Sequence, residues 1–289
     1  MMTDIPNLDQ LIQMALLEDV GDGDHSTLAC IPATATNTAK MVAKQEGVVC
    51  GMEVGERVFR FVNDAFYHNP IPVEVALLKK DGDHVEKGEV LMTINGPSAT
   101  ILTAERTALN FMQRLSGIAT ETHHMVKMLE GTHTRLLDTR KTTPNMRLLE
   151  KYAVHCGGGT NHRIGLYDMV MLKDNHIDFA GGIEAAIDRT HAYLKEKGKN
   201  LRIEIEVRNL DELEQVMQHG GIDRIMLDNF DTDTLRKAVQ RIGGKYETEA
   251  SGGITEDTLR NYAETGVDFI SVGALTHHIK SMDISLVKK

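Results

Sequence analysis

Apolar residues in the first third of the chain follow first a helical period and then an alternating one. Residues 8–19 repeat apolar side chains at helical spacing, which predicts an amphipathic helix. Short strands are expected at residues 40–51, 72–85 and 89–97. Residues 103–130 return to helical spacing and predict one or two helices. This part of the chain is therefore expected to form a small α+β unit.

From about residue 133 the pattern changes to apolar strands that alternate with amphipathic helices. Strands are predicted at residues 134–139, 167–173, 201–207, 222–228, 246–251 and 267–272. The helices between them include residues 182–197, 210–219 and 233–241. Repeated strand-helix units build parallel sheets. Charged or glycine residues at the strand ends favour an α/β barrel over an open sheet, although the two patterns are similar.

Composition and charge narrow the classes of partner. The chain has 289 residues, which predicts one large barrel or two domains. A net charge of -10 and the absence of tryptophan argue against a nucleic-acid partner. No apolar run approaches membrane-spanning length, and three cysteines without a CxxC spacing outline neither a disulfide scaffold nor a zinc site. We expect a cytoplasmic protein that acts on small molecules, without a membrane partner.

A group of positive charges stands out in this acidic chain. Arg140 and Lys141 follow an apolar run, His162 and Arg163 follow three glycines, and Lys173 ends another apolar run. Each cation thus lies at a predicted strand end or beside a glycine turn, where α/β enzymes place their chemistry. Arginine binds carboxylate and phosphate through paired, charge-assisted hydrogen bonds. The group therefore predicts a site for a small, multiply charged anion.

Two carboxylates end later strands and predict a metal position. Glu206 and Asp228 lie at strand ends that a parallel arrangement brings to one mouth. A divalent metal bound to phosphate and sugar hydroxyls fits such a pair, and a simple salt bridge is the alternative. Glu204 lies on the same strand face as Glu206, so the pattern alone does not choose between them.

Glycine turns follow the last two predicted strands. They contain Ser251, Gly252, Gly253 and Gly273. Backbone amides at such turns bind phosphate, and the last two βα loops are the usual phosphate position in a barrel. Each turn by itself is explained as well by an ordinary tight turn. Thr255 is predicted to cap the helix that begins at Glu256.

Lys173 has two chemical interpretations. It is either an ammonium that binds an anion or a Schiff-base amine. Asp174 follows it directly, and a Schiff-base lysine prefers burial away from acids, so anion binding is favoured. A Schiff-base lyase and a metabolite-binding protein without activity are the competing function classes at this point.

Ordered blocks along nearly the whole chain resemble the quinolinate phosphoribosyltransferases. The blocks are residues 104–120, 138–144, 157–177, 204–207, 226–230, 249–254 and 271–277. The resemblance implies an α/β fold with an N-terminal α/β sandwich domain at residues 1–115, rejoined by the tail 275–289. It implies an incomplete α/β barrel of about seven strands at residues 116–274. A related family implicated in molybdenum transport shares the fold, but the full set of carboxylate-binding cations favours the quinolinate enzymes.

The resemblance also implies a reaction of NAD biosynthesis. The phosphoribosyl group of phosphoribosyl pyrophosphate would be transferred to quinolinate with decarboxylation, which gives nicotinate mononucleotide, carbon dioxide and pyrophosphate. The quinolinate-binding residues would be Arg140, His162, Arg163 and Lys173. Arg106 would enter the site from the partner subunit of a homodimer.

The sugar donor and its Mg2+ have their own implied positions. The residues around them would be Lys141, Glu206, Asp228, Ser251, Gly252, Gly253 and Gly273. Among these, Lys141, Glu206 and Asp228 would take part in catalysis, and Glu206 and Asp228 would hold the metal. The resemblance thus selects Glu206 over Glu204.

Overall fold

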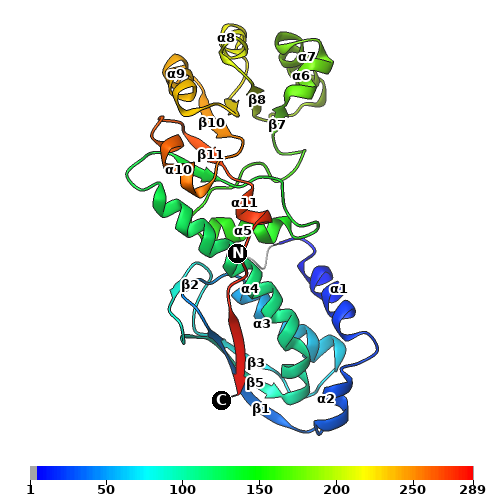
Figure 1. Cartoon of the computed structure of the whole chain (residues 1–289). Coiled ribbons are helices and arrows are strands. Elements are labelled where there is room, and N and C mark those ends of the chain that lie inside the picture. Colours follow the sequence, from blue (N-terminus) through cyan, green and yellow to red (C-terminus); the bar gives the residue numbers. More distant parts are fainter. Residues whose placement is uncertain (1–4, 289) are drawn as a thin grey trace. The chain divides into compact units, whose positions relative to one another are not determined.

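The computed structural model describes residues 5–288, which belong to two compact units (Figure 1). Of the described residues, the first unit contains residues 5–123, Thr142–Gly158 and residues 275–288, and the second contains His124–Lys141 and Gly159–Ala274. The C-terminal segment from Leu275 and the internal segment Thr142–Gly158 both belong to the first unit. Thr142–Gly158 joins the first unit because Arg114 pairs with the fully buried Glu150 at 2.6 Å.

Four antiparallel strands form the main sheet of the first unit, in the order β12-β1-β5-β3. Their bounds are β1 Thr36–Ala43, β3 Glu74–Leu77, β5 Val90–Pro97 and β12 Ile284–Lys288. Met41 of β1 lies opposite Met92 of β5, and both side chains are fully buried. Two further strands, β2 (Gly47–Val48) and β4 (His84–Val85), pair separately. The predicted strand 40–51 is thus divided between β1 and β2.

The helices of this part of the chain lie before, between and after these strands in the sequence. They are α1 Leu8–Val20, α2 His25–Cys30, α3 Met52–Phe61 with the π-helix η2 Val62–Phe66, α4 Ser98–Met128, α5 Arg147–Cys156 and α11 Ala274–His277. The predicted helical stretch 103–130 forms one long helix, α4. A Cβ atom at Gly117 would collide with the backbone of Lys280, so the C-terminal segment passes close to α4 only because residue 117 is glycine.

Six parallel strands form the sheet of the second unit, in the order β6-β11-β10-β9-β8-β7. Their bounds are β6 Arg135–Leu137, β7 Val170–Leu172, β8 Ile203–Val207, β9 Arg224–Asp228, β10 Glu247–Ser251 and β11 Phe269–Ser271. All six predicted strands are confirmed. Thr160 adds an isolated parallel bridge to Leu137 of β6. About seven strands were expected. The described sheet has six strands, and the single bridge at Thr160 stands in the place of a seventh.

Helices alternate with these strands along the chain, as βα units require. They are α6 Asp174–Ala180, α7 Ile183–Lys197, α8 Leu210–His219, α9 Thr232–Ile242 and α10 Glu256–Ala263. Figure 1 shows α7, α8 and α9 outside the strands. The predicted capping role of Thr255 is confirmed, since its backbone N–H donates to Thr258 Oγ1 at 3.0 Å at the start of α10. Within residues 5–288, no helix is long and apolar enough to cross a bilayer.

The parallel sheet curves around its own interior face. His162, two residues beyond the bridge at Thr160, reaches both Glu204 of β8 and Glu249 of β10. Thr160 pairs with β6 at one edge of the sheet, and β8 is the fourth strand from β6, so a flat sheet would not bring His162 within reach of Glu204. Alternation along β8 places Glu204 and Glu206 on this interior face and the apolar residues between them on the other.

Candidate active site

The predicted arginines of the anion site lie at the carboxyl ends of neighbouring parallel segments. Burial lowers the pKa of Arg163, and the positive charge of Arg140 lowers that pKa further. Among the described residues, Arg140 Nε is buried and has no hydrogen-bond partner. Two guanidinium groups close enough to repel each other, one with an unsatisfied donor, form a site that an anion would stabilise.

His162 is held in a fixed orientation beside these arginines. Its backbone N–H donates to Asp138 Oδ1 at 2.8 Å, and Asn161 Nδ2 donates to Asp138 Oδ2 at 2.6 Å. Asp138 is fully buried and holds both the backbone of His162 and the side chain of Asn161 in place. On the ring, Nδ1 accepts from the backbone N–H of Arg163, and Nε2 lies 3.0 Å from Glu204 and 3.3 Å from Glu249.

Glu204, Glu249 and Arg224 form a buried ionic cluster around the His162 ring that sequence reasoning missed. Both carboxyl groups are fully buried, and Arg224 Nη1 donates to Glu249 Oε2 at 3.1 Å. Burial and the charge of Glu249 raise the pKa of Glu204 to about 7. Burial opposes ionisation of Glu249 as well, but His162 and Arg224 hold the pKa of Glu249 below its usual value. A signal existed: Glu204 and Glu249 lie two positions before the strand-end residues Glu206 and Ser251, on the same strand face.

Glu206, Asp228 and Lys173 interact at the ends of three neighbouring strands. Burial raises the pKa of Glu206, the charge of Asp228 raises it further, and Lys173 lowers it. Burial also raises the pKa of Asp228. A hydrogen bond from Asn229 and the charges of Lys173 and Lys141 lower this pKa, but burial outweighs them. Lys173 is exposed, unlike the buried amine that Schiff-base chemistry prefers. The carboxylate pair with two nearby ammonium groups suits a metal-bound phosphate ester.

The turn after β10 closely approaches the turn after β9. Asn229 N–H donates to the carbonyl of Ser251 at 2.8 Å, and Ser251 lies opposite Asp228 in the sheet. Gly252 has φ +98°, and a Cβ atom there would overlap Asn229 Oδ1. Both the backbone conformation and the lack of space therefore require glycine at this position. Gly253 also has a positive φ, with open space where a Cβ would be. Gly273 follows β11 at the same edge of the sheet.

The second unit therefore assembles every predicted site residue except one. Arg106 is an exposed residue of α4 in the first unit. Lys141 is the last residue of the first segment of the second unit, and its charge acts on Asp228.

Comparison with known proteins identifies the family. The family model for the C-terminal domain of quinolinate phosphoribosyl transferase matches residues 118–287, and the model for its N-terminal domain matches residues 24–116. The chain belongs to the quinolinate phosphoribosyltransferase family. The resemblance inferred from the sequence blocks and the two-part α/β fold are thereby confirmed.

Similar proteins align with almost the whole length of this phosphoribosyltransferase. The chloroplastic carboxylating nicotinate-nucleotide pyrophosphorylase of Arabidopsis thaliana is 42% identical, over 97% of this chain and 82% of the relative. A probable carboxylating nicotinate-nucleotide pyrophosphorylase of Bacillus subtilis (strain 168) is 42% identical, over 96% of this chain and 92% of the relative. The nicotinate-nucleotide pyrophosphorylase structure from Francisella tularensis has a TM-score of 0.91 and 40% identity, and the match covers 99% of this chain and 98% of that one.

The buried cluster predicts how the stability of this phosphoribosyltransferase depends on pH. Burial lowers the pKa of His162, but Glu204 and Glu249 outweigh it and raise the pKa from 6.5 to about 9. The carboxylates set the direction, because two buried charges near Nε2 exceed the effect of one backbone hydrogen bond at Nδ1. The folded state thus holds more protons than the unfolded state between pH 6.5 and 9, so the free energy of unfolding should fall as pH rises through this window.

Urea denaturation at several pH values measures this effect. The fall in the urea midpoint across the window should be smaller in His162→Gln, which has no imidazole to titrate. Equal slopes in the two proteins would contradict the assignment of the proton to this cluster.

Proposed function

We propose that this chain transfers the phosphoribosyl group of phosphoribosyl pyrophosphate to quinolinate and releases carbon dioxide and pyrophosphate, giving nicotinate mononucleotide for NAD biosynthesis. The main support is the Arg140–Arg163 pair with its unsatisfied Nε donor, beside the buried His162. A pyridine with two adjacent carboxylates supplies the negative charges that this pair lacks. The carboxylate pair Glu206–Asp228 at neighbouring strand ends supports a position for the sugar donor there.

The positive residues are assigned by the charges that they neutralise. Arg140, His162, Arg163 and Lys173 contact the carboxylates of quinolinate. Lys141, together with the backbone amides at Ser251–Gly253 and Gly273, contacts the phosphates of the donor, as glycine turns at the end of parallel strands do elsewhere. Arginine is suited to the first group because its planar fork matches a carboxylate.

A Mg2+ ion fits the Glu206–Asp228 pair. Burial and mutual repulsion raise the pKa of Glu206, so a divalent cation would favour the ionised form of both carboxyl groups. Their oxygen atoms are the hard ligands that Mg2+ prefers, with donor phosphates completing its coordination. When bound, the ion neutralises charge on the pyrophosphate leaving group.

The side chains act mainly by position and charge. They hold the pyridine nitrogen against ribose C1, where the C–O bond to pyrophosphate breaks and the N–C bond forms through an oxocarbenium-like transition state. Glu206 and Asp228, close to the donor, favour positive charge at the ribose. After the transfer, the positive ring nitrogen stabilises the carbanion that is left on the adjacent ring carbon when its carboxylate departs as carbon dioxide. A proton from solvent then completes the ring C–H bond.

An assay with quinolinate, phosphoribosyl pyrophosphate and Mg2+, read as carbon dioxide release, tests this function. We expect one carbon dioxide per pyrophosphate, and no carbon dioxide when nicotinate replaces quinolinate. Quinolinate binding without pyrophosphate release would instead support a binding protein. Trapping of substrate on Lys173 by borohydride would support a Schiff-base enzyme.

Asp228→Asn is expected to weaken the use of Mg2+. The amide keeps the shape of the side chain but removes the charge that attracts the cation. The Mg2+ concentration for half-maximal activity should rise by about tenfold or more, equivalent to about 1.4 kcal/mol. Asp231→Asn is the matched control, since Asp231 caps α9 and is exposed. An unchanged Mg2+ requirement in Asp228→Asn would remove Asp228 from the metal site.

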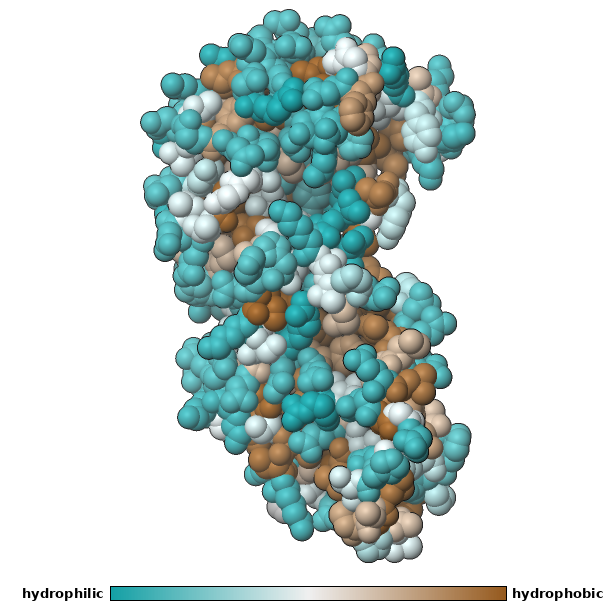
Figure 2. Space-filling model, turned by 45° about the vertical axis from the view of Figure 1, so that its right-hand side comes forward, coloured by the Kyte–Doolittle hydropathy of each residue, from teal (hydrophilic) through white to brown (hydrophobic). Residues whose placement is uncertain are grey.

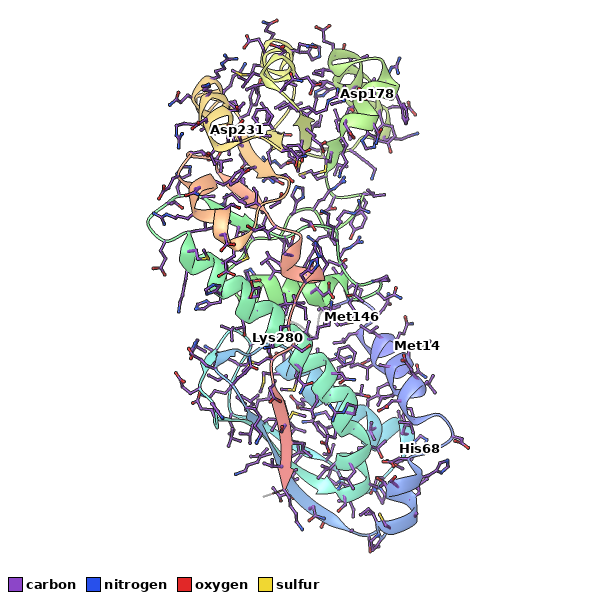
Figure 3. The ribbon with its side chains drawn as sticks, viewed as in Figure 1. Met14, His68, Met146, Asp178, Asp231 and Lys280 are labelled. Carbon is purple, nitrogen blue, oxygen red and sulfur yellow. The ribbon has the colours of Figure 1, made fainter. Side chains whose placement is uncertain are left out.

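A homodimer in which Arg106 enters the partner's site is a further part of the proposal. Each unit has exposed apolar side chains near the residues assigned to the site, and exposed apolar surfaces are typical of interfaces. On the first unit they include Leu102 in the turn of α4 before Arg106, and Met14 on α1. On the second they include Tyr167, four residues after Arg163, and Phe179 on α6, which is 87% exposed. Figure 2 shows hydrophobic residues among hydrophilic ones on one face. Figure 3 labels Met14 on α1 and Asp178 on α6.

Mixing two inactive variants tests the shared site. Arg106→Ala and Lys173→Ala should each lose most activity, because each removes a cation that contacts the substrates. After unfolding and refolding together, half of the dimers would be mixed and would hold one intact site of two, so about one quarter of the normal activity should return. Refolding of each variant alone is the control. No recovery in the mixture would contradict an Arg106 that crosses between subunits.

A cytoplasmic location completes the proposal. All three cysteines are free thiols, which is typical of a reducing compartment. Cell fractionation with antibody detection tests the location, and recovery of the protein in an organelle or outside the cell would contradict it.

A further inference from the structure

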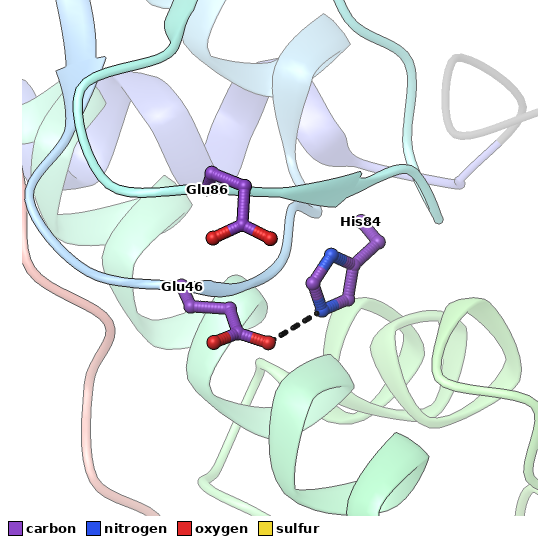
Figure 4. A group of neighbouring side chains, drawn as sticks. All are labelled: Glu46, His84 and Glu86. Carbon is purple, nitrogen blue, oxygen red and sulfur yellow. Dashed lines mark ion pairs between the residues drawn. The ribbon is translucent and has the colours of Figure 1, made fainter.

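We propose that Glu46, His84 and Glu86 form a zinc-binding site on the first unit, separate from the carboxylate pair Glu206–Asp228. The three residues each offer one ligand atom, and these atoms all lie within 4.8 Å of one another. His84 Nε2 is 3.1 Å from Glu46 Oε1. Figure 4 shows the imidazole edge and both carboxylates directed toward a common point.

The backbone around the three residues holds them in register. His84 lies on β4 opposite Val48 of β2, and Glu46 and Glu86 flank this short pair. Val48 N–H donates to Thr120 Oγ1 on α4 at 2.9 Å, which ties the strand pair to a long helix. Glu86 N–H donates to Glu89 Oε2 at 2.7 Å, which closes the turn after β4. Binding of an ion would therefore need side-chain rotation and little movement of the backbone.

The charges of the group call for a cation. Two carboxylates this close repel each other. Among residues 5–288, neither Glu46 nor Glu86 forms an ion pair with a lysine or arginine, and Glu46 pairs only with His84. The side chains of His84 and Glu46 are 42% and 66% exposed, so an ion can enter from solvent and the ligands lose little hydration.

The ligand set selects zinc over the hard cations. Mg2+ and Ca2+ prefer oxygen ligands only, whereas imidazole with carboxylate suits Zn2+. Tetrahedral zinc at roughly 2.0–2.1 Å from each ligand atom requires ligand atoms about 3.3 Å apart, so a contraction of at most about 1.5 Å between atoms of exposed side chains is sufficient. A second imidazole, that of His123 on α4, has its ring centre 6.3 Å from that of His84. Water fills the fourth position of a three-ligand site.

A bound ion would fasten the β2–β4 pair. Its ligands come from the segments before β2, within β4 and after β4, so the ion links two chain segments about 40 residues apart in sequence that separate on unfolding. Since the ion binds the folded site and not the dispersed ligands, zinc should raise the thermal midpoint of the chain.

Zinc titration of the full chain tests this inference. The protein is stripped with a chelator, exchanged into chelator-free buffer, and titrated with Zn2+ by calorimetry in the Asp228→Asn background, which weakens the other carboxylate pair. We expect one zinc per chain, a higher thermal midpoint with zinc, and d–d absorption bands of a low-symmetry site when Co2+ replaces it. His84→Ala should weaken zinc binding by about 10- to 100-fold and abolish the thermal shift.

His25→Ala is the matched control, because His25 is also an exposed imidazole of the first unit but faces a single carboxylate, Asp22, at 3.4 Å. It should bind zinc as the parent does. Glu46→Gln should weaken binding as His84→Ala does, with circular dichroism unchanged in all variants. Equal zinc affinity in His84→Ala and His25→Ala, or the absence of a stoichiometric site in the parent, would overturn the proposal.

Discussion

Arg163→Ala is expected to reduce kcat/KM for quinolinate by roughly 30- to 5,000-fold, which corresponds to about 2 to 5 kcal/mol. Arg163 is half-buried and is already destabilised as a cation by burial and by Arg140, as the lowered pKa of Arg163 records. In the working enzyme, the negative charge of the ligand must compensate for this destabilisation of the Arg163 cation. Removal of the guanidinium leaves a substrate carboxylate partly desolvated and without its partner, and this loss is larger than that of a surface ion pair.

Steady-state kinetics with each substrate varied in turn measures this effect. The loss should appear mainly in kcat/KM for quinolinate, with a smaller change in KM for phosphoribosyl pyrophosphate. Arg163→Lys should recover only part of the activity, because an ammonium keeps the charge but not the paired hydrogen bonds of the fork. Arg236→Ala, an exposed arginine that pairs with Asp233 on α9, should behave as the parent. Normal quinolinate kinetics in Arg163→Ala would withdraw the anion-site assignment.

Arg224→Ala is expected to lower the free energy of unfolding by about 3–5 kcal/mol, the largest stability effect that we predict. Arg224 is 7% exposed and pairs with both Glu247 and the fully buried Glu249. Its guanidinium also lies 4.2 Å from the centre of the Phe269 ring. Without Arg224, the negative charge shared by Glu204 and Glu249 would be left in the interior with His162 alone.

Arg202→Ala is the matched control for this prediction. Arg202 donates to the same Glu247 oxygen at 2.7 Å, but it is about half exposed and does not reach Glu249, so its loss should cost less than about 1 kcal/mol. Urea denaturation measures both variants, and hydrogen exchange of the amides in β8 to β10 assigns the loss to the second unit. Similar midpoints for the two variants would show that the buried cluster is not maintained by Arg224.

The sequence predicted most strands of the second unit because they are short apolar runs bounded by turn residues, whereas β10 (Glu247–Ser251) is mostly polar. β8 and β9 match the predicted segments closely, since Ile and Val of β8 and Ile and Leu of β9 stand at alternate positions on one face. Two features were harder to predict. The first is β2 at Gly47–Val48, because two residues carry no period. The second is the placement of α5, which looks like one helix among others but joins the first unit through Arg114 and Glu150.

The strand-end residues of the site were visible in the sequence for a related reason. Parallel strands bring their carboxyl ends to one edge, so Lys173, Glu206 and Asp228 were expected to be neighbours, and they lie at or directly beside the ends of the neighbouring strands β7, β8 and β9. The choice between Glu204 and Glu206 was open, because both point to the same face. The structure separates them by depth: Glu204 is fully buried against His162, and Glu206 lies one layer nearer the mouth.

By itself, the sequence determined the alternation of strands and helices, the family, and the positions where charged residues end strands, because these depend on local period and on the order of residue types. Only the tertiary structure decided that Glu204, Glu249 and Arg224 meet around His162, that Arg140 retains an unsatisfied buried donor, and that Glu46, His84 and Glu86 converge. These features depend on curvature of the sheet and on pairing between distant segments. The physical reason is that burial and charge-charge distance arise from the packing of the whole chain, and no local pattern records them.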